Sequence, residues 1–120
     1  MTLQQKLERI GNALVEGLTQ DGELICGVYH YWRSQKGAPF VVWAESYEDE
    51  PINGDNRKAE QAIRGYVDAY SKTEFDPLFD DVQSILNGLA EDMPFGWMLD
   101  SVQYEEETNL IHYQWIWSVA

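Results

Sequence analysis

The chain of 120 residues has one cysteine, few basic residues and no long hydrophobic run, and each shortage excludes a class of protein. Cys26 alone cannot build an intramolecular disulfide framework, which suits a reducing compartment. Because no run of 18 apolar residues is present, we expect no transmembrane helix. The first residues lack the charged and apolar regions of a signal peptide, so we expect a soluble protein made in the cytosol.

Basic residues are both scarce and unevenly distributed. Eight Lys and Arg stand against 21 Asp and Glu, which gives a formal net charge of −13. All eight basic residues lie at or before Lys72, so residues 73–120 contain ten acidic residues and no Lys or Arg. A field of this sign repels phosphate groups. We therefore expect no direct nucleic-acid binding and no membrane binding.

Sequence motifs of catalysis and metal binding are also missing. The chain contains no GxSxG, HExxH, P-loop or GxGxxG pattern. Cys26, His30 and His112 are the only Cys and His residues, and no two of them have the short spacing of a zinc site. Cys26 lies in an apolar segment beside Gly27, where a free thiol usually packs as a small hydrophobic group. We expect no enzyme, no cofactor and no metal.

What is present indicates one globular domain over residues 1–120. The chain is 44% hydrophobic and 13% aromatic, which is too apolar for a disordered chain and enough for a core without disulfides. A stripe of apolar residues from Leu3 to Leu18 predicts an amphipathic helix. Thr2 and Gln5 form a capping-box pattern at its start. A second helix is predicted to begin at Asp76-Pro77 and to end at 87–88 or at 93–94.

The remaining segments predict strands. Residues 24–33 and 40–44 are rich in β-branched and aromatic side chains and predict a hairpin about a turn at 34–37. Residues 45–58 predict a long exposed loop, and 59–72 favour a strand. Residues 97–104 and 110–119 predict two strands about a loop at 105–109, and 110–119 alternates most clearly.

The predicted order is α-β-β-β-α-β-β. This order is typical of an α+β domain in which a largely antiparallel sheet carries two helices packed on one face. Five residues are expected in its core: Leu7, Leu14, Trp43, Leu86 and Trp115.

Two acidic clusters and two tryptophans are the candidate interface residues. The clusters could instead confer only solubility, and the tryptophans could instead belong to the core, so both alternatives stay open. The candidates are Glu48, Asp49, Glu50, Glu105, Glu106, Glu107, Trp115 and Trp117.

Several segments, in this order, resemble a family of phage proteins. They are Pro39–Glu45, Asp55-Asn56, Ala59-Glu60, Lys72–Asp81 and Ser101–Tyr113.

These segments are similar to the tail completion, or tail terminator, proteins of long-tailed phages and of prophages in Gram-positive bacteria. The resemblance implies an α+β fold with one sheet and packed helices. It implies a ring, usually a hexamer, at the head-proximal end of the tail. The ring ends growth of the tail tube and joins the tail to the head, so its partners are the tail tube protein and the head connector protein. The resemblance places the protein in the virion tail after synthesis in the cytoplasm of the host bacterium, and it implies no catalytic residues.

Two other functions remain open on sequence. The charge of −13 also suits an acidic DNA mimic that inhibits a DNA-binding protein. A different small subunit of the tail or of the head–tail neck would share much of the same pattern. Displacement of DNA from a DNA-binding protein separates the mimic from the structural proteins.

Overall fold

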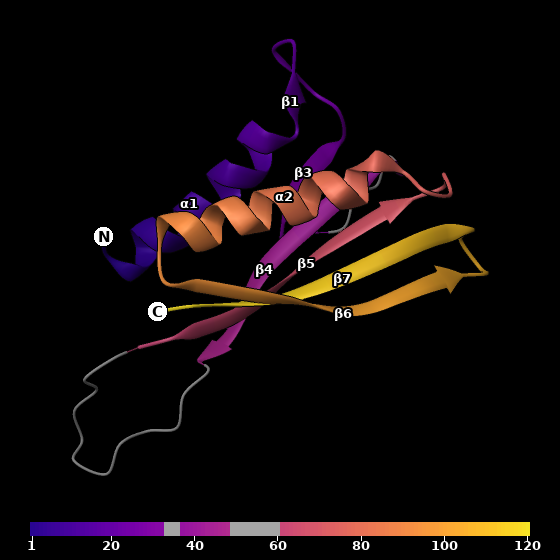
Figure 1. Ribbon diagram of the computed structural model, residues 1–120. Helices are drawn as coiled ribbons and strands as arrows, with labels where there is room; N and C mark the ends of the chain where they lie inside the picture. Colours follow the sequence, from indigo (N-terminus) through magenta and orange to yellow (C-terminus); the bar gives the residue numbers. More distant parts are fainter. Residues whose placement is uncertain (33–36, 49–60) are drawn as a thin grey trace.

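The computed structural model describes residues 1–32, 37–48 and 61–120 and has an α+β architecture (Figure 1). Strands β3 to β7 form one sheet in the order β3-β4-β5-β7-β6, and β1 and β2 pair separately. In the sheet, β3 and β4 are parallel and the other neighbouring pairs are antiparallel. The elements are α1 (Leu3–Gly17), β1 (Thr19–Gln20), β2 (Glu23–Leu24), β3 (Gly27–His30), β4 (Phe40–Glu48), β5 (Ile63–Ser71), α2 (Pro77–Asp92), β6 (Phe95–Glu105) and β7 (Leu110–Val119).

Both helices begin where their sequences predict. The hydroxyl of Thr2 accepts a hydrogen bond from the Gln5 backbone N–H at 3.2 Å, and the Gln5 side chain accepts one from the Thr2 N–H at 2.8 Å. This reciprocal pair is the predicted capping box. At α2, the Asp76 carboxylate accepts from the Leu78 N–H at 2.9 Å, and Pro77 occupies the first turn. Of its two predicted ends, the later one is confirmed, because α2 continues to Asp92.

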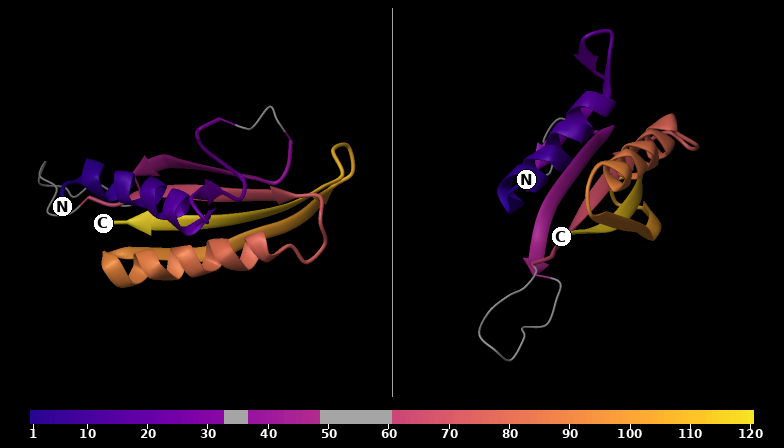
Figure 2. Two further views of the ribbon diagram at one scale, coloured as in Figure 1. Left: turned by 90° about the horizontal axis from the view of Figure 1, so that it is seen from above. Right: turned by 60° about the vertical axis from the view of Figure 1, so that its left-hand side comes forward.

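The two helices lie on the same face of the sheet (Figures 1 and 2). Their apolar stripes pack on alternate residues of β4, β5 and β7, and together they form the main core. α1 and α2 also contact each other, because Gly17 leaves room for the side chain of Ile85. All five residues predicted for the core are buried.

The predicted hairpin between residues 24–33 and 40–44 is wrong. β3 and β4 are neighbours, but they run parallel, with Val28 beside Val41 and His30 beside Trp43. The prediction assumed a tight reversal at 34–37, of which 34–36 lie outside the described residues. A parallel pair instead needs a connection that returns the chain to the end where the first strand began. The chain leaves β3 at Tyr31, whose φ of 75° lies in the left-handed region.

Two boundaries also differ from the prediction. β4 extends through Glu48, so the first part of the loop predicted over 45–58 is strand, and residues 49–58 lie outside the described residues. A register shift between Glu45 and Tyr47 hides this continuation, because it breaks the two-residue alternation. The strand predicted over 24–33 is shorter in the structure, where β3 covers only Gly27–His30. Leu24 belongs instead to the small β1–β2 hairpin, whose turn residues Asp21 and Gly22 both have positive φ.

Neither helix in the described part of the chain is both long enough and apolar enough to cross a membrane.

Candidate interaction surface

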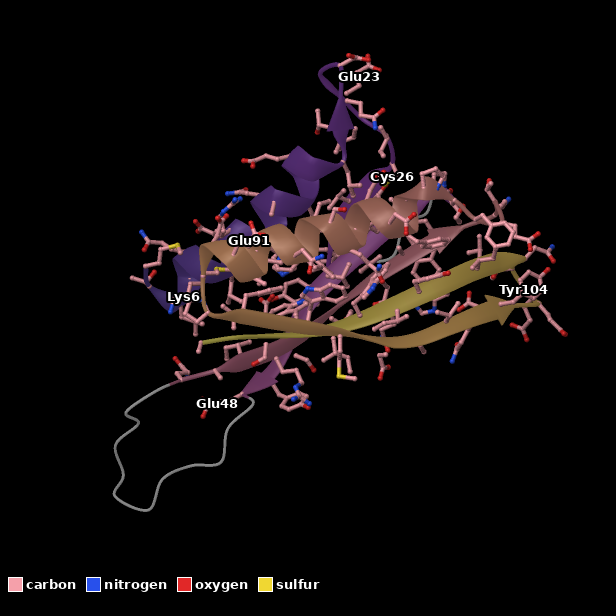
Figure 3. All side chains as sticks on the ribbon, in the orientation of Figure 1. Lys6, Glu23, Cys26, Glu48, Glu91 and Tyr104 are labelled. Atoms are coloured by element: carbon pink, nitrogen blue, oxygen red, sulfur yellow. The ribbon has the colours of Figure 1, made fainter. Side chains whose placement is uncertain are left out.

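The two predicted acidic clusters lie at opposite ends of the sheet. Glu48 is the last residue of β4 and pairs with Ile63 of β5. Ile63 in turn pairs with Val119, so Glu48 lies at the end of the sheet where β7 ends. Glu105 ends β6 and pairs with Leu110 at the other end, where the β6–β7 turn carries Glu106 and Glu107. Figure 3 shows the same separation between the labelled Glu48 and Tyr104. The structure therefore does not bring the clusters together, and Asp49 and Glu50 lie outside the described residues.

Trp115 and Trp117 belong to the core and are not available as interface residues on this subunit. They are 0% and 1% exposed and lie on the helix-covered face of β7. The indole N–H of Trp115 donates to Gln83 of α2 at 3.1 Å, which satisfies its polar atom inside the core. Strand alternation placed both rings on one face, but it could not tell that two helices cover that face. Of the two roles left open for these tryptophans, core packing is correct.

The edge strand β6 exposes apolar side chains that the sequence analysis did not single out. β6 spans Phe95–Glu105 and pairs with β7 on one side. No other strand in the described ranges pairs with its outer side. Its exposed large apolar residues are Met98, Leu99, Val102 and Tyr104, and Met98 and Tyr104 are 61% and 60% exposed. A long edge strand with apolar side chains is a surface on which another chain can add a strand.

The sheet face opposite the helices holds a buried polar cluster. Asp68 on β5 is only 5% exposed, and one of its carboxylate oxygens lies 2.6 Å from His112 Nε2. The same oxygen accepts a hydrogen bond from Gln114 at 3.0 Å. The other ring nitrogen of His112 lies 3.5 Å from the carboxylate of Glu105. Tyr70 stacks on the imidazole with ring centroids 4.2 Å apart. The cluster ties β5, β6 and β7 together.

The three residues considered for a zinc or Cys–His site do not meet. Cys26 is buried in the main core, and burial raises the pKa of its thiol to about 11. His30 lies on the helix side of β3, whereas His112 lies on the opposite face of β7. Among the residues that the structure describes, no group of three or more His, Cys, Asp or Glu is placed to hold a metal ion.

A groove lies between α1 and the β3–β4 edge. Its volume is about 290 Å³. The ring of Trp43 packs against α1 at Gly11, because this glycine has no side chain to occupy the space. A Cβ on Gly11 would lie only 2.6 Å from the Trp43 ring. The imidazole of His30 stacks on Trp43 and on Tyr31, with ring centroids 3.9 Å apart in both pairs. The lining residues are Gln4, Leu7, Glu8, Gly11, Asn12, His30, Trp43 and Glu45.

Glu45 is the charged centre of this groove. Its carboxylate accepts a hydrogen bond from the Tyr31 hydroxyl and lies 2.8 Å from His30 Nε2. Burial alone raises the pKa of Glu45, but the hydrogen bonds from Tyr31 and His30 outweigh it, so the net pKa is below its ordinary value. The same contact with Glu45 raises the pKa of Tyr31. Because an ionised carboxylate only accepts hydrogen bonds, Nε2 of His30 carries a proton.

Comparison of the chain with known proteins finds no protein-family model that matches it and no curated protein that is significantly similar to it.

The sequence contained one signal for the groove. Gly11 falls four residues after Leu7 on the buried side of an otherwise apolar stripe, which indicates that a large group approaches the helix there. The identity of that group as Trp43, and the stack with His30, depend on the parallel pairing of β3 with β4, which the sequence analysis missed.

Proposed function

We propose that the protein is a structural subunit of a phage or prophage particle. It forms a ring at the head-proximal end of the tail, ends growth of the tail tube and joins the tail to the head. The proposal combines the resemblance in sequence with a fold of the kind that this resemblance implies, one sheet with two helices on one face. In this role the chain binds other copies of itself, the tail tube protein and the head connector protein, and catalyses no reaction.

The exposed edge of β6 is the observation that best supports self-association. A closed ring needs two different surfaces on each subunit that fit each other around a rotation axis. The sheet has two unlike edges, the short strand β3 and the long strand β6. β6 presents an outer row of backbone groups that pairs with no strand of the described residues, and the exposed side chains of Met98 and Val102. Pairing of this edge with a neighbouring subunit would bury both.

The charge distribution also favours the proposed role. The β6–β7 turn carries Glu105, Glu106 and Glu107 at one end of the sheet, and no Lys or Arg occurs after Lys72. A channel through which DNA passes must not bind the phosphate backbone tightly, and carboxylates repel it. We therefore assign this acidic end to the channel of the ring or to the docking face for the head.

Electron microscopy of particles made after deletion of this reading frame tests the proposed function. We expect overlong tails, or tails and filled heads that do not join. Overlong tails indicate the terminator role, and unjoined tails of normal length indicate the joining role. Intact and infectious particles would refute the structural role. In that case, displacement of DNA from a DNA-binding protein tests the DNA-mimic alternative.

A matched pair of variants tests the role of β6 in the same assay. Val102→Lys places a charge on the exposed edge strand, and we expect it to fail to restore normal tails in the deletion strain. Val15→Lys places the same charge on an exposed position of α1 and serves as the control. Circular dichroism and thermal unfolding establish that both variants fold. If Val102→Lys restores normal particles as well as the control does, the edge of β6 is not an interface.

A further inference from the structure

The second half of β6 carries an apolar face that α2 does not cover. At the start of the strand, the Trp97 indole donates to Asn87 of α2 at 3.1 Å. Beyond this point β6 runs away from α2 toward the β6–β7 turn (Figure 1). Three apolar residues follow there, which we call the β6 apolar face: Leu99, Val102 and Tyr104 are 40%, 51% and 60% exposed. Apolar side chains gathered on one exposed surface are typical of an interaction site.

A β-bulge places these three side chains on the same side of the sheet. The register of β6 on β7 shifts between Leu99 and Ser101. Without this shift, alternation after Leu99 would turn the polar side chains of Ser101 and Gln103 to the helix side. With it, Val102 and Tyr104 lie on that side, paired with β7 residues that pack on the main core. The bulge therefore directs apolar side chains, and not polar ones, to the uncovered surface.

The ring of Tyr104 is fixed before any partner binds. Its hydroxyl donates to Oδ1 of Asn109 at 2.8 Å, and Asn109 lies in the β6–β7 turn with a φ of 56°. Figure 3 labels Tyr104 at this end of the sheet. A side chain that is already held in place loses little conformational freedom on binding. Tyrosine is also among the residues that most often contribute strongly to protein interfaces.

The surroundings of the β6 apolar face are acidic. Asp100 is exposed at the bulge, and Glu106 and Glu107 are exposed in the adjoining turn. No Lys or Arg occurs after Lys72. A chain that packs on this face therefore needs apolar side chains at its centre and basic side chains around them.

We propose that the β6 apolar face binds an amphipathic helix of a partner protein, with lysine or arginine beside its apolar stripe. A helix suits the side of the sheet on which α1 and α2 already pack. Leu99 and Tyr104 pair with Trp115 and Ile111, so about 13 Å separates them along the sheet. That length equals about two and a half helical turns, which carry a stripe of about three or four apolar residues.

The inference deepens the proposed function and rests on it only for the expectation that the partner is another protein of the particle. Such a helix would contact side chains on the face of β6. The backbone groups along the outer edge of β6 stay available for a neighbouring subunit.

Titration of the purified protein with three designed peptides tests the inference, in about 150 mM salt so that weak, unspecific charge attraction is screened. The first peptide repeats the pattern Leu-Lys-Lys-Leu-Leu-Lys-Leu, which places leucine on one side of a helix. The second peptide has Glu in place of each Lys. The third alternates Leu and Lys strictly, as a strand would.

The indole N–H signals of the protein, followed by NMR, report where the peptides bind. We assign the signals with Trp97→Phe and Trp32→Phe. The first peptide should shift the Trp97 signal in a saturable way and leave Trp32 unchanged, because Trp32 is 72% exposed but follows β3 at the other edge of the sheet. The peptide with Glu should bind about tenfold more weakly or not at all. If Trp97 does not respond, or if either of the other peptides binds as tightly as the first, the assigned partner is wrong.

Two matched pairs of variants locate the site. Leu99→Lys and Leu24→Lys add the same charge at exposed leucines of β6 and β2. Leu99→Lys should weaken the first peptide by about tenfold, and Leu24→Lys by less than about twofold. Tyr104→Ala and Tyr47→Ala, at exposed tyrosines of β6 and β4, form the second pair and remain informative if Leu99→Lys disturbs the bulge.

Circular dichroism establishes that each variant folds. If both members of each pair bind alike, the β6 apolar face is not the site. Because this assay contains no phage particle and the deletion assay contains no peptide, either proposal can fail while the other stands.

Discussion

The two faces of the five-stranded sheet use the same strands but are stabilised in different ways. On the helix-covered face, alternate residues of β4, β5 and β7 pack beneath α1 and α2, and Val41, Val67 and Trp115 are fully buried. On the opposite face, the intervening residues include a smaller apolar cluster around Phe40 and Tyr70. Beside it lies the polar cluster of Asp68, His112 and Gln114.

The difference lies in what satisfies the buried polar atoms. On the covered face, α2 supplies acceptors for two indoles: Gln83 accepts from the Trp115 indole, and Asn87 accepts from the more exposed Trp97 indole at 3.1 Å. The buried Trp117 indole N–H on this face has no acceptor among the described residues. On the opposite face, no helix of the described residues is present to do so, and the strands pair their polar side chains with one another. The covered face therefore depends on tight packing, and the opposite face depends on polar contacts among strand residues.

Removal of Trp115 should give the largest loss of stability. Trp115→Ala deletes a fully buried indole and leaves Gln83 without its donor. We expect the free energy of unfolding to fall by about 3–5 kcal/mol. Ile116→Ala, on the next residue and the opposite face, is the matched control and should cost clearly less, because Ile116 is only partly buried. Urea denaturation measures the free energy of unfolding of both variants. If the two variants lose the same amount, the two faces of the sheet do not differ in their dependence on packing.

A pair of glycines provides a second test of the same contrast. Gly65 lies on the covered face, where a Cβ would meet the Trp117 ring at 2.2 Å and the Ala44 carbonyl oxygen at 2.3 Å. Gly65→Ala should therefore destabilise the protein by up to about 3 kcal/mol. Gly96 lies across from Ser118 on the opposite face, and a Cβ there would meet nothing within 4 Å.

Gly96→Ala should leave stability unchanged or raise it slightly, because alanine has less conformational freedom to lose on folding. Thermal unfolding of both variants measures the difference. If Gly65→Ala is as stable as Gly96→Ala, packing on the covered face is looser than the structure indicates.

The polar cluster of the opposite face is tested through Asp68. Asp68→Ala removes the acceptor shared by His112 and Gln114 and leaves both in a partly buried site. We expect a loss of about 2 kcal/mol in the free energy of unfolding. Gln114→Ala removes one donor and keeps the contact between Asp68 and His112, so it should cost less. If both variants match the parent chain, the cluster is present but does not stabilise this face.

Features encoded over a few neighbouring residues were predicted from the sequence. The start of α1 follows from Thr2 and Gln5, and the start of α2 follows from Asp76 and Pro77. The alternation of 110–119 separated the two faces of β7 correctly, with Trp115 buried. These features depend on hydrogen bonds and side-chain periods within one element, so the sequence alone determines them.

Features that depend on strand order or on contacts between distant elements were not predicted. The direction of β3 relative to β4 is set by the path of the connection and not by either strand's composition. The groove was missed for the same reason, since Gly11, His30 and Glu45 come from three elements. Asp68 and its partner His112 lie 44 residues apart in the chain, so no local pattern pairs them. Both acidic clusters were found as candidates, whereas their separation required the register of the strands.

The smallest expected effect concerns Glu45, at the rim of the helix-covered face. Its pKa in the folded protein is lower than the ordinary value of 4.5, so folding favours the ionised form. This contribution to stability is present above pH 4.5 and is lost as the pH falls through the folded pKa. The difference in unfolding free energy between the parent chain and Glu45→Gln should be below about 1 kcal/mol at neutral pH and should shrink in acid. Tyr31→Phe removes one of the hydrogen bonds that lower this pKa, so in this variant the loss of stability in acid should begin at a higher pH. Chemical denaturation across this pH range gives the free energy of unfolding of the parent chain and of both variants. If the difference between the parent chain and Glu45→Gln stays constant with pH, Glu45 contributes through packing and not through its charge.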